Sequence, residues 1–151
     1  MIEVVNENNF DELLGLMRQY QEFYQVVSIS DERNREFFAQ FGQHSSLGCQ
    51  FLYRRNKIAV GFATVYFSFS STAVAKVAIM NDLYTRPESR GQGVGKALIN
   101  HCLDYALGRD AVRLQWTTAL DNEVAQRLYN SLETSKKPWL FYLYQKQSQT
   151  S

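Results

Sequence analysis

The spacing of hydrophobic positions changes several times along the chain, and each change predicts a different element of secondary structure. Apolar residues that recur every three to four positions line one face of a helix. Short apolar runs rich in β-branched and aromatic residues are typical of strands. The helical spacing predicts helices over residues 11–27, 31–41, 94–107 and 122–132. The apolar runs predict strands over residues 2–5, 49–54, 58–69, 74–84, 111–117 and 139–145.

Residues that favour helix ends and turns mark several of these boundaries. Ser30 can cap the second helix, and Gly42 follows it as a stop signal. Gly108 closes the third helix, Pro87 ends the fourth strand region, and Pro138 precedes the last strand. The resulting order predicts an α/β fold with a mixed sheet, in which an antiparallel meander comes first and a strand–helix–strand unit follows.

Composition adds that the chain is globular. It has 151 residues, of which 45% are hydrophobic and 21% charged, a balance that excludes intrinsic disorder for most of the chain. The length predicts one domain over residues 1–146. Residues 147–151 form a polar tail.

Charge and cysteine usage exclude several function classes. The formal net charge is +1, which gives no general electrostatic reason to bind nucleic acid. Cys49 and Cys102 form no Cys-x-x-Cys pattern and are expected to be buried thiols. His101 adjoins Cys102, but neighbours on a helix do not face the same way, so no metal site is predicted.

The chain shows no sign of a targeting or membrane-spanning segment. Residues 1–5 lack the basic and apolar regions of a signal peptide. The longest uncharged run, residues 58–75, contains the polar turn Ser70-Ser71-Thr72 and is interpreted as two strands and not as a membrane helix. We therefore expect a cytoplasmic protein with no membrane partner.

The most informative segment is a glycine-rich loop between a strand and a helix. It reads Arg90-Gly91-Gln92-Gly93-Val94-Gly95-Lys96. Glycine allows a positive φ and a close approach of backbone to a ligand. The free N–H groups at a helix N-terminus favour an anion, and Arg90 and Lys96 add positive charge. The loop therefore predicts a phosphate or pyrophosphate site.

Two common phosphate motifs do not fit this loop. The pattern Gly-x4-Gly-Lys-[Ser/Thr] would need glycine at Arg90 and a hydroxyl residue at Ala97. The dinucleotide pattern Gly-x-Gly-x-x-Gly would need glycine at Lys96. A different class of phosphate-bearing ligand is therefore expected.

The loop resembles the acetyl-CoA-binding motif of the GNAT N-acetyltransferase superfamily, Arg/Gln-x-x-Gly-x-Gly/Ala. Residues 90–95 fit it without a gap, and residues 83–87 resemble the strand that precedes it. Residues 122–129 resemble a second signature, Asn-x-x-Ala-x-x-Leu-Tyr. The resemblance implies a mostly antiparallel sheet with a splayed central strand pair, flanked by about four helices, and acetyl-CoA as co-substrate with no metal.

The same resemblance implies which residues hold the cofactor. The backbone of the strand before the loop would pair with the pantetheine arm, and the loop would bind the phosphates. The implied cofactor-binding residues are Leu83, Tyr84, Thr85, Arg90, Gly91, Gln92, Gly93, Val94, Gly95, Lys96, Asn122 and Tyr129. A role in capping a helix is the alternative for Asn122.

The implied reaction is direct attack of a primary amine on the thioester in a ternary complex. Tyr129 matches the family's general acid beside the sulfur. Asp82 is the candidate general base, acting through water, since the neighbouring Asn81 cannot accept a proton in this role. Candidate acceptor-binding residues are Tyr20, Tyr24 and Asp121, because rings and carboxylates suit a cationic amine.

Three points stay open at this level. The acceptor could be a small molecule or a protein amine. A non-catalytic acyl-CoA-binding sensor or partner module on the same fold is the alternative function. Residues 132–137 depart from the family's Leu-Gly-Phe loop, and the aromatic strand over residues 139–144 could cover a sheet edge or pair with a partner subunit. Because family members often dimerise, a homodimer is expected.

Overall fold

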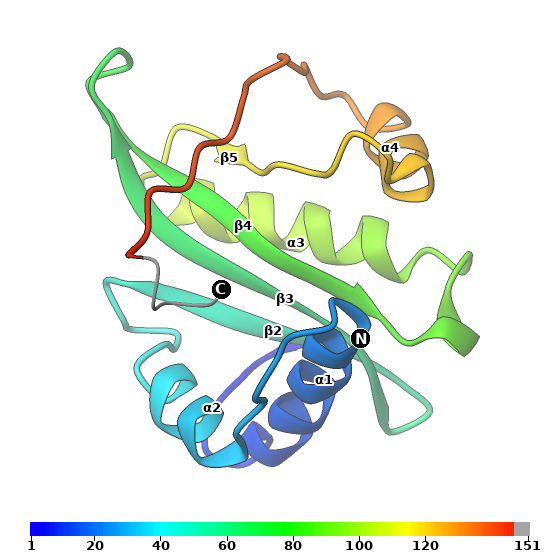
Figure 1. Ribbon diagram of the computed structural model, residues 1–151. Helices are drawn as coiled ribbons and strands as arrows, with labels where there is room; N and C mark the ends of the chain where they lie inside the picture. Colours follow the sequence, from blue (N-terminus) through cyan, green and yellow to red (C-terminus); the bar gives the residue numbers. More distant parts are fainter. Residues whose placement is uncertain (147–151) are drawn as a thin grey trace.

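Five strands form one sheet, in the order β1-β2-β3-β4-β5 (Figure 1). The computed structural model of the protein describes residues 1–146. Neighbouring strands are antiparallel from β1 to β4, whereas β5 runs parallel to β4. The strands are β1 (Ile2–Val4), β2 (Gly48–Arg55), β3 (Ile58–Ser70), β4 (Ala75–Thr85) and β5 (Leu114–Gln115). The predicted meander followed by a strand–helix–strand unit is confirmed.

Helices cover both faces of this sheet. On one face, α1 (Phe10–Phe23) and α2 (Asp31–Phe38) pack against the side chains of Leu52, Phe62 and Tyr84. On the other face, α3 (Val94–Gly108) packs against a second cluster of buried side chains from β2, β3 and β4. The last helix, α4 (Glu123–Asn130), lies near the N-terminal end of α3 (Figure 1), and its Leu128 and Tyr129 pack against the same cluster. Along each central strand, successive side chains belong alternately to one cluster and to the other, because they point to opposite faces of the sheet.

A β-bulge interrupts β4 next to Asp82, the predicted general base. Thr64 of β3 faces Asp82, but the next residue, Val65, faces Met80, so Asn81 is an extra residue with no cross-strand partner. A bulge increases the local twist and bends the strand. The bulge therefore turns the second half of β4 away from the line of its first half.

The same region of the sheet opens on its other side. β5 pairs with β4 only at Ala78 and Ile79. Beyond that point, no strand within residues 1–146 lies along the edge of β4 that faces away from β3. The pair of strands splays apart, which is the opening that the family resemblance implied. Figure 1 shows α4 and the segment before it on the far side of this gap.

Three predicted elements differ most from the observed ones, while the second and fourth helices are shorter than predicted by three residues each. The first helix ends at Phe23 and not at residue 27, because Gln25 and Ser28 adopt left-handed φ values of 56° and 61°. The strand predicted over 111–117 is reduced to two residues. The strand predicted over 139–145 is absent, and residues 135–146 form neither helix nor strand. Strands need a hydrogen-bonded neighbour, and an apolar run cannot supply one by itself.

Two further expectations concern the thiols and the membrane. Cys49 and Cys102 are buried and free, as predicted. Burial raises the pKa of the Cys49 thiol to about 11 and that of Cys102 to about 12. Among the helices of residues 1–146, none is long and apolar enough to span a bilayer. The polar tail predicted over 147–151 lies outside the described residues.

Candidate active site

The glycine loop follows the end of β4 and leads into α3. A short 3-10 helix, Pro87–Ser89, turns the chain after β4. Gly91 and Gly93 then adopt φ values of +74° and +85°, in the left-handed region that side chains disfavour. A Cβ atom at either position would meet no other atom within 4 Å. The glycines are therefore required by backbone conformation, and the space outside the loop is open.

The N-terminus of α3 presents unpaired backbone donors at this loop. The Ala97 N–H donates to the Gly93 carbonyl oxygen at 3.0 Å, which is the first hydrogen bond of the helix. The N–H groups of residues 94–96 precede it and have no helical acceptor. No acidic side chain lies in the first turn, so nothing there neutralises the positive end of the helix dipole. The arrangement suits a phosphate group.

Gly95 has a different role from the other two glycines. A Cβ atom on Gly95 would lie 3.0 Å from Cδ2 of Leu128 in α4. That distance is shorter than ordinary van der Waals contact. The missing side chain therefore lets α3 approach α4, which carries Tyr129, and it joins the loop to the opposite wall of the gap.

Arg90 is directed differently from the sequence expectation. Its Nε donates to the Thr85 carbonyl oxygen at 2.9 Å. Its guanidinium group lies 5.3 Å from the ring centre of Phe23 and 5.8 Å from that of Tyr84. The side chain therefore folds back over β4 and the end of α1 and braces the loop. Lys96 is exposed and remains free to approach a phosphate.

Backbone hydrogen bonds show which groups of β4 face the gap. The Arg86 N–H donates to the Val60 carbonyl oxygen of β3 at 2.8 Å. Because backbone groups alternate in direction along a strand, those of Leu83 and Thr85 face away from β3 and toward the gap. The backbone groups of Tyr84 point toward β3. Its side chain is buried, and the ring packs against α1. The backbone groups of Leu83 and the N–H of Thr85 thus present an open strand edge to a ligand, whereas the Thr85 carbonyl oxygen already accepts the hydrogen bond from Arg90.

Asp82 is buried within a polar cluster on the face that α1 covers. Only 7% of its surface is exposed, and the Asn81 side chain donates to its Oδ1 at 3.0 Å. Burial raises the pKa of the Asp82 carboxyl above its ordinary value, while hydrogen bonding from Thr64, Tyr20 and Asn81 acts in the opposite direction. A carboxylate with a raised pKa is a better proton acceptor than an exposed one.

Thr64 and Gln50 extend this cluster across the sheet, and the sequence interpretation missed both. Gln50 of β2 donates from its Nε2 to the Thr64 hydroxyl oxygen at 3.0 Å, and both side chains are fully buried. The Thr64 hydroxyl then has its proton available for Asp82. A recognisable signal existed, because each is a polar residue at an inward-facing position of an otherwise apolar strand.

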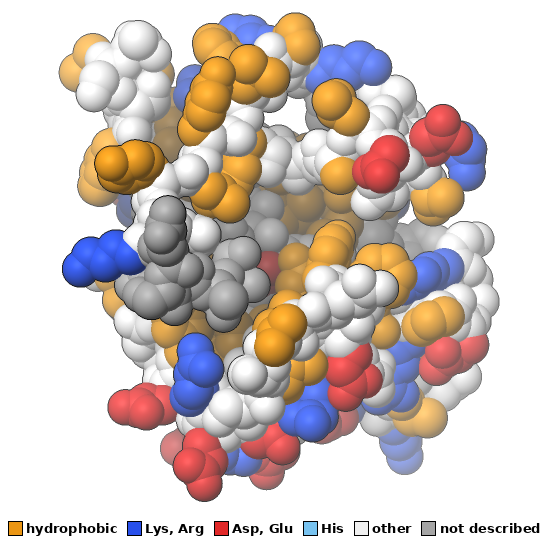
Figure 2. Space-filling model, viewed as in Figure 1, with side chains coloured by type: hydrophobic (Ala, Val, Ile, Leu, Met, Phe, Trp, Pro, Cys, Tyr) orange, Lys and Arg blue, Asp and Glu red, His pale blue; other side chains and the backbone are white. Residues whose placement is uncertain are grey.

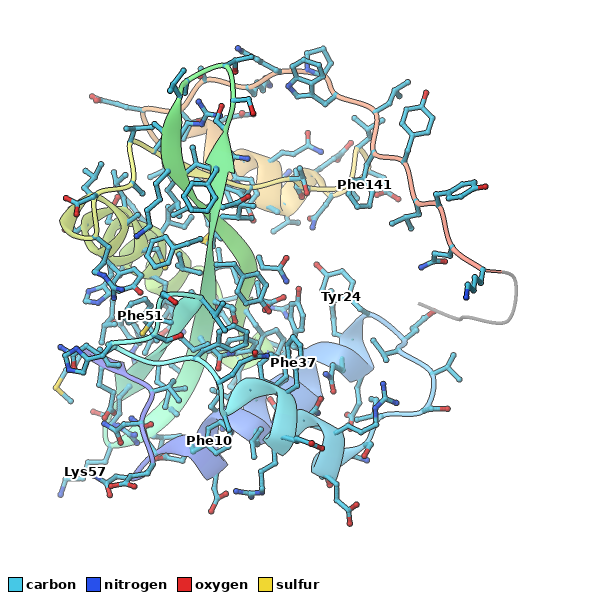
Figure 3. All side chains as sticks on the ribbon, turned by 90° about the vertical axis from the view of Figure 1, so that its left-hand side faces the viewer. Phe10, Tyr24, Phe37, Phe51, Lys57 and Phe141 are labelled. Carbon is cyan, nitrogen blue, oxygen red and sulfur yellow. The ribbon has the colours of Figure 1, made fainter. Side chains whose placement is uncertain are left out.

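Aromatic side chains surround the same opening. Tyr20 and Tyr24 of the α1 end pack edge to face, with ring centres 4.9 Å apart. Tyr129 packs against Trp116, with ring centres 5.2 Å apart. Burial and, secondarily, the phenol of Tyr24 raise the pKa of Tyr129 above its ordinary value. Figure 3 shows Tyr24 projecting away from the body of α1 and α2 into this space.

Two predicted site residues, Asn122 and Asp121, precede α4 and differ in their surroundings. The Asn122 side-chain oxygen accepts the Ala125 N–H at 3.2 Å and caps α4, which is the alternative considered for it. Asp121 is exposed in the turn before the helix. Figure 2 shows a hollow with hydrophobic side chains along it on this face, between the helical layer of α1 and the α4 region.

Comparison with known proteins assigns this arrangement to a family. The profile of the Acetyltransferase (GNAT) family matches residues 13–133. YhfO of Bacillus subtilis (strain 168), described as an uncharacterized N-acetyltransferase, is 34% identical over 116 residues, covering 76% of this chain and 75% of its own. The thialysine N-epsilon-acetyltransferase of Bos taurus is 29% identical over 140 residues, covering 87% of this chain and 82% of its own.

A solved structure agrees with these relatives. The crystal structure of a probable acetyltransferase superposes with a TM-score of 0.82 at 30% identity, covering 97% of this chain and 99% of that one. Nothing in the comparisons favours the alternative of a non-catalytic binding module. The chain therefore belongs to the GNAT acetyltransferase family and is an acetyl-CoA-dependent N-acetyltransferase.

Proposed function

We propose that this enzyme transfers the acetyl group directly to a small primary amine, with Asp82 as general base and Tyr129 as general acid. The observation that supports the proposal is that Asp82 is a buried carboxyl beside the bulge in β4, while Tyr129 of α4 packs against Trp116. We place the two groups on either side of the open edge of β4. No side chain has to be covalently acetylated in this scheme.

The residues present fit acetyl-CoA. The N–H groups at the start of α3 would bind its phosphates, and the open edge at Leu83 and Thr85 would pair with the amides of its pantetheine arm, as an added strand does. Open space around Gly91 and Gly93 leaves room for the ligand to approach the backbone. This fit supports binding of the co-substrate along β4, with its thioester near Tyr129.

In the reaction, the ammonium group of the acceptor first loses a proton to Asp82 through a bound water. The neutral amine nitrogen then attacks the thioester carbon and forms the C–N bond. The C–S bond breaks, and the sulfur takes the phenolic proton of Tyr129. The second proton of the attacking nitrogen then passes through water to the Tyr129 phenolate, which leaves a neutral amide and restores the phenol. A phenol with a raised pKa remains protonated at neutral pH and can serve as this donor.

The acceptor we propose is a primary amine at the end of an aliphatic chain. Relatives from Bos taurus, Mus musculus and Sus scrofa are named thialysine N-epsilon-acetyltransferases. The rings of Tyr20 and Tyr24 border the opening, and an amine cation is stabilised by aromatic faces. We further propose a cytoplasmic location, because the reaction consumes acetyl-CoA and both cysteines are free thiols.

The direct test combines binding and turnover. We expect saturable acetyl-CoA binding by calorimetry, and release of free CoA when thialysine, lysine or a polyamine is added. A panel of α-amines and protein amines provides the comparison. Binding without CoA release on any amine would reject catalysis, and preference for protein amines would reject the small-molecule acceptor.

Thr64→Val should shift the pH dependence of turnover upward. The Thr64 hydroxyl lowers the pKa of Asp82 by hydrogen bonding, so its removal raises that pKa. A lost hydrogen bond to a charged group of about 1.5 kcal/mol corresponds to about one pH unit. We expect the acid limb of the kcat/KM profile to move up by about that amount. Thr64→Ser keeps the hydroxyl and should restore the profile; an unchanged profile in Thr64→Val would contradict this role.

Gly93→Ala should weaken acetyl-CoA binding. An L-residue at φ +85° costs about 1–2 kcal/mol, which is a factor of about 5–30 in the dissociation constant if the loop has to relax. Gly15→Ala is the matched control, because Gly15 lies in α1 with open space around its Cβ position. Calorimetry should show no change for the control; equal affinity in both variants would argue against binding at this loop.

A further inference from the structure

The Arg90 side chain connects the glycine loop to the end of α1. Its Nε donates to the Thr85 carbonyl oxygen at 2.9 Å. The rest of the guanidinium group lies over two rings, with its central carbon 5.3 Å from the ring centre of Phe23 and 5.8 Å from that of Tyr84. The ion pairs formed among residues 1–146 do not include Arg90. The two aromatic faces are therefore the main partners of its charge.

Both rings beneath this guanidinium group pack against residues of the proposed acceptor site. Phe23 packs edge to face against Tyr24, with ring centres 5.2 Å apart. Tyr84 packs edge to face against Tyr20, with ring centres 6.0 Å apart, and the Tyr20 hydroxyl is hydrogen-bonded to Asp82. A displacement of the guanidinium group would therefore reach each of the two tyrosines through a single intervening ring.

The end of α1 is attached to α2 more firmly than to the glycine loop. Two reciprocal hydrogen bonds, of 2.9 and 2.8 Å, join the side-chain amides of Gln21 and Asn34. On the side of the loop, the Phe23 residue is 57% exposed, so core packing contributes little there. Within residues 10–23, the last turn contains no basic side chain to balance the helix dipole. Arg90 supplies both a contact and a positive charge at this end of the helix.

We propose that Arg90 is a positioning residue for the amine acceptor and not a ligand of the co-substrate phosphates. The inference rests on the proposed acceptor site at Tyr20 and Tyr24. By holding the end of α1 against β4, the guanidinium group fixes both tyrosine rings at the opening. An ammonium group is stabilised only by aromatic faces that lie close to it, so a displaced pair of rings would bind the acceptor less tightly. The phosphates are left to the N–H groups at the start of α3.

Arg90→Gln separates the two roles, because the acetyl-CoA motif that this loop resembles has either Arg or Gln at its first position. We expect the dissociation constant for acetyl-CoA, measured by calorimetry, to stay unchanged. The KM for the best amine should rise about 5–10-fold, the size of a lost cation–π interaction. The kcat should be retained, because Asp82 keeps its hydrogen bonds from Thr64 and Asn81. Arg90→Lys keeps a cation and should have an intermediate KM. Weaker acetyl-CoA binding with an unchanged amine KM would make Arg90 a phosphate ligand and overturn the proposal.

Substitutions of Phe23 test the same contact from the side of α1. Phe23→Leu removes the ring and should also raise the amine KM, whereas Phe23→Tyr keeps a ring and should retain the wild-type value. The double variant R90Q/F23L should have the KM of Arg90→Gln alone, because the leucine removes nothing more once the guanidinium group is gone. Phe37→Leu, at a half-exposed ring of α2, is the control and should leave the KM unchanged. Effects that multiply in the double variant would mean that Phe23 acts independently of Arg90, which contradicts the proposal.

A readout that needs no turnover separates this proposal from the proposed function. The melting temperatures of the wild type, the two single variants and R90Q/F23L form a cycle that measures the coupling between Arg90 and Phe23. We expect the double variant to melt with the less stable single variant. If no amine is acetylated, the proposed function fails, while this cycle still reports whether Arg90 holds the end of α1. Additive shifts in melting temperature would reject the positioning role whatever the activity.

Discussion

Tyr129→Phe should lower kcat by about 10²-fold while leaving the affinity for acetyl-CoA unchanged. The substitution removes only the hydroxyl group, so the edge-to-face contact between this ring and Trp116 remains. Without a proton donor, the sulfur must leave as a thiolate. A thiol is a fairly good leaving group with a pKa of about 8.5, which places the expected effect at the lower end of the range for acid catalysis.

The measurement is steady-state CoA release, with acetyl-CoA binding followed separately by calorimetry. Tyr105→Phe is the matched control, since Tyr105 lies on α3 and packs against Phe51 and Phe67 on the other face of the sheet. Its kcat should equal that of the wild type. A loss of acetyl-CoA affinity in Tyr129→Phe, with kcat preserved, would assign the phenol to binding and not to proton transfer.

Asp82→Asn should lower kcat/KM by about 10²–10³-fold and abolish the acid limb of its pH profile. The buried carboxyl of Asp82 has a raised pKa, so the active carboxylate form is lost as the pH falls through that value. In the wild type, the midpoint of this limb should therefore lie above the ordinary value of about 3.9 for an aspartate. The amide has no such titration and cannot accept the proton at any pH.

The stability of the fold gives an independent check on the same group. Because the folded-state pKa of Asp82 lies above its unfolded value, this group favours folding at pH values below the unfolded pKa. That contribution is lost as the pH rises through the folded pKa. Asp82→Asn should remove this pH dependence and keep or raise the melting temperature at neutral pH. If Asp82→Asn lost activity because it unfolded, Asp82 would be assigned a structural role and not that of a base. If the variant kept the activity of the wild type, Asp82 would be excluded from proton transfer.

Elements with a strong local pattern were predicted well. The helix from Val94 begins and ends within about one residue of its prediction, because the glycines before it and Gly108 at its end act through local backbone geometry. The two strands Gly48–Arg55 and Ile58–Ser70 also match closely, because the polar turn at Asn56 and Lys57 separates two long apolar runs. Both residues of that turn adopt positive φ.

Elements that depend on a partner were predicted poorly. The aromatic run at residues 139–145 has the composition of a buried strand, yet its strand character requires an edge that the chain itself does not bring to it. β5 is shortened for the same reason. Composition predicts what a segment can form, whereas hydrogen-bond partners decide whether it forms.

The sequence by itself determined the family, the order of the elements and the glycine loop, since each depends on residue types at short, regular spacing. Only the tertiary structure decided how the site is assembled. Register and the bulge at Asn81 place Thr64 opposite Asp82, and Gln50 joins them from a third strand. The same packing directs the Arg90 side chain back to the Thr85 carbonyl oxygen, and it makes the Asn122 side chain the N-cap of α4. Contacts between residues far apart in the chain arise only when strands pair and helices pack, so no local pattern contains them.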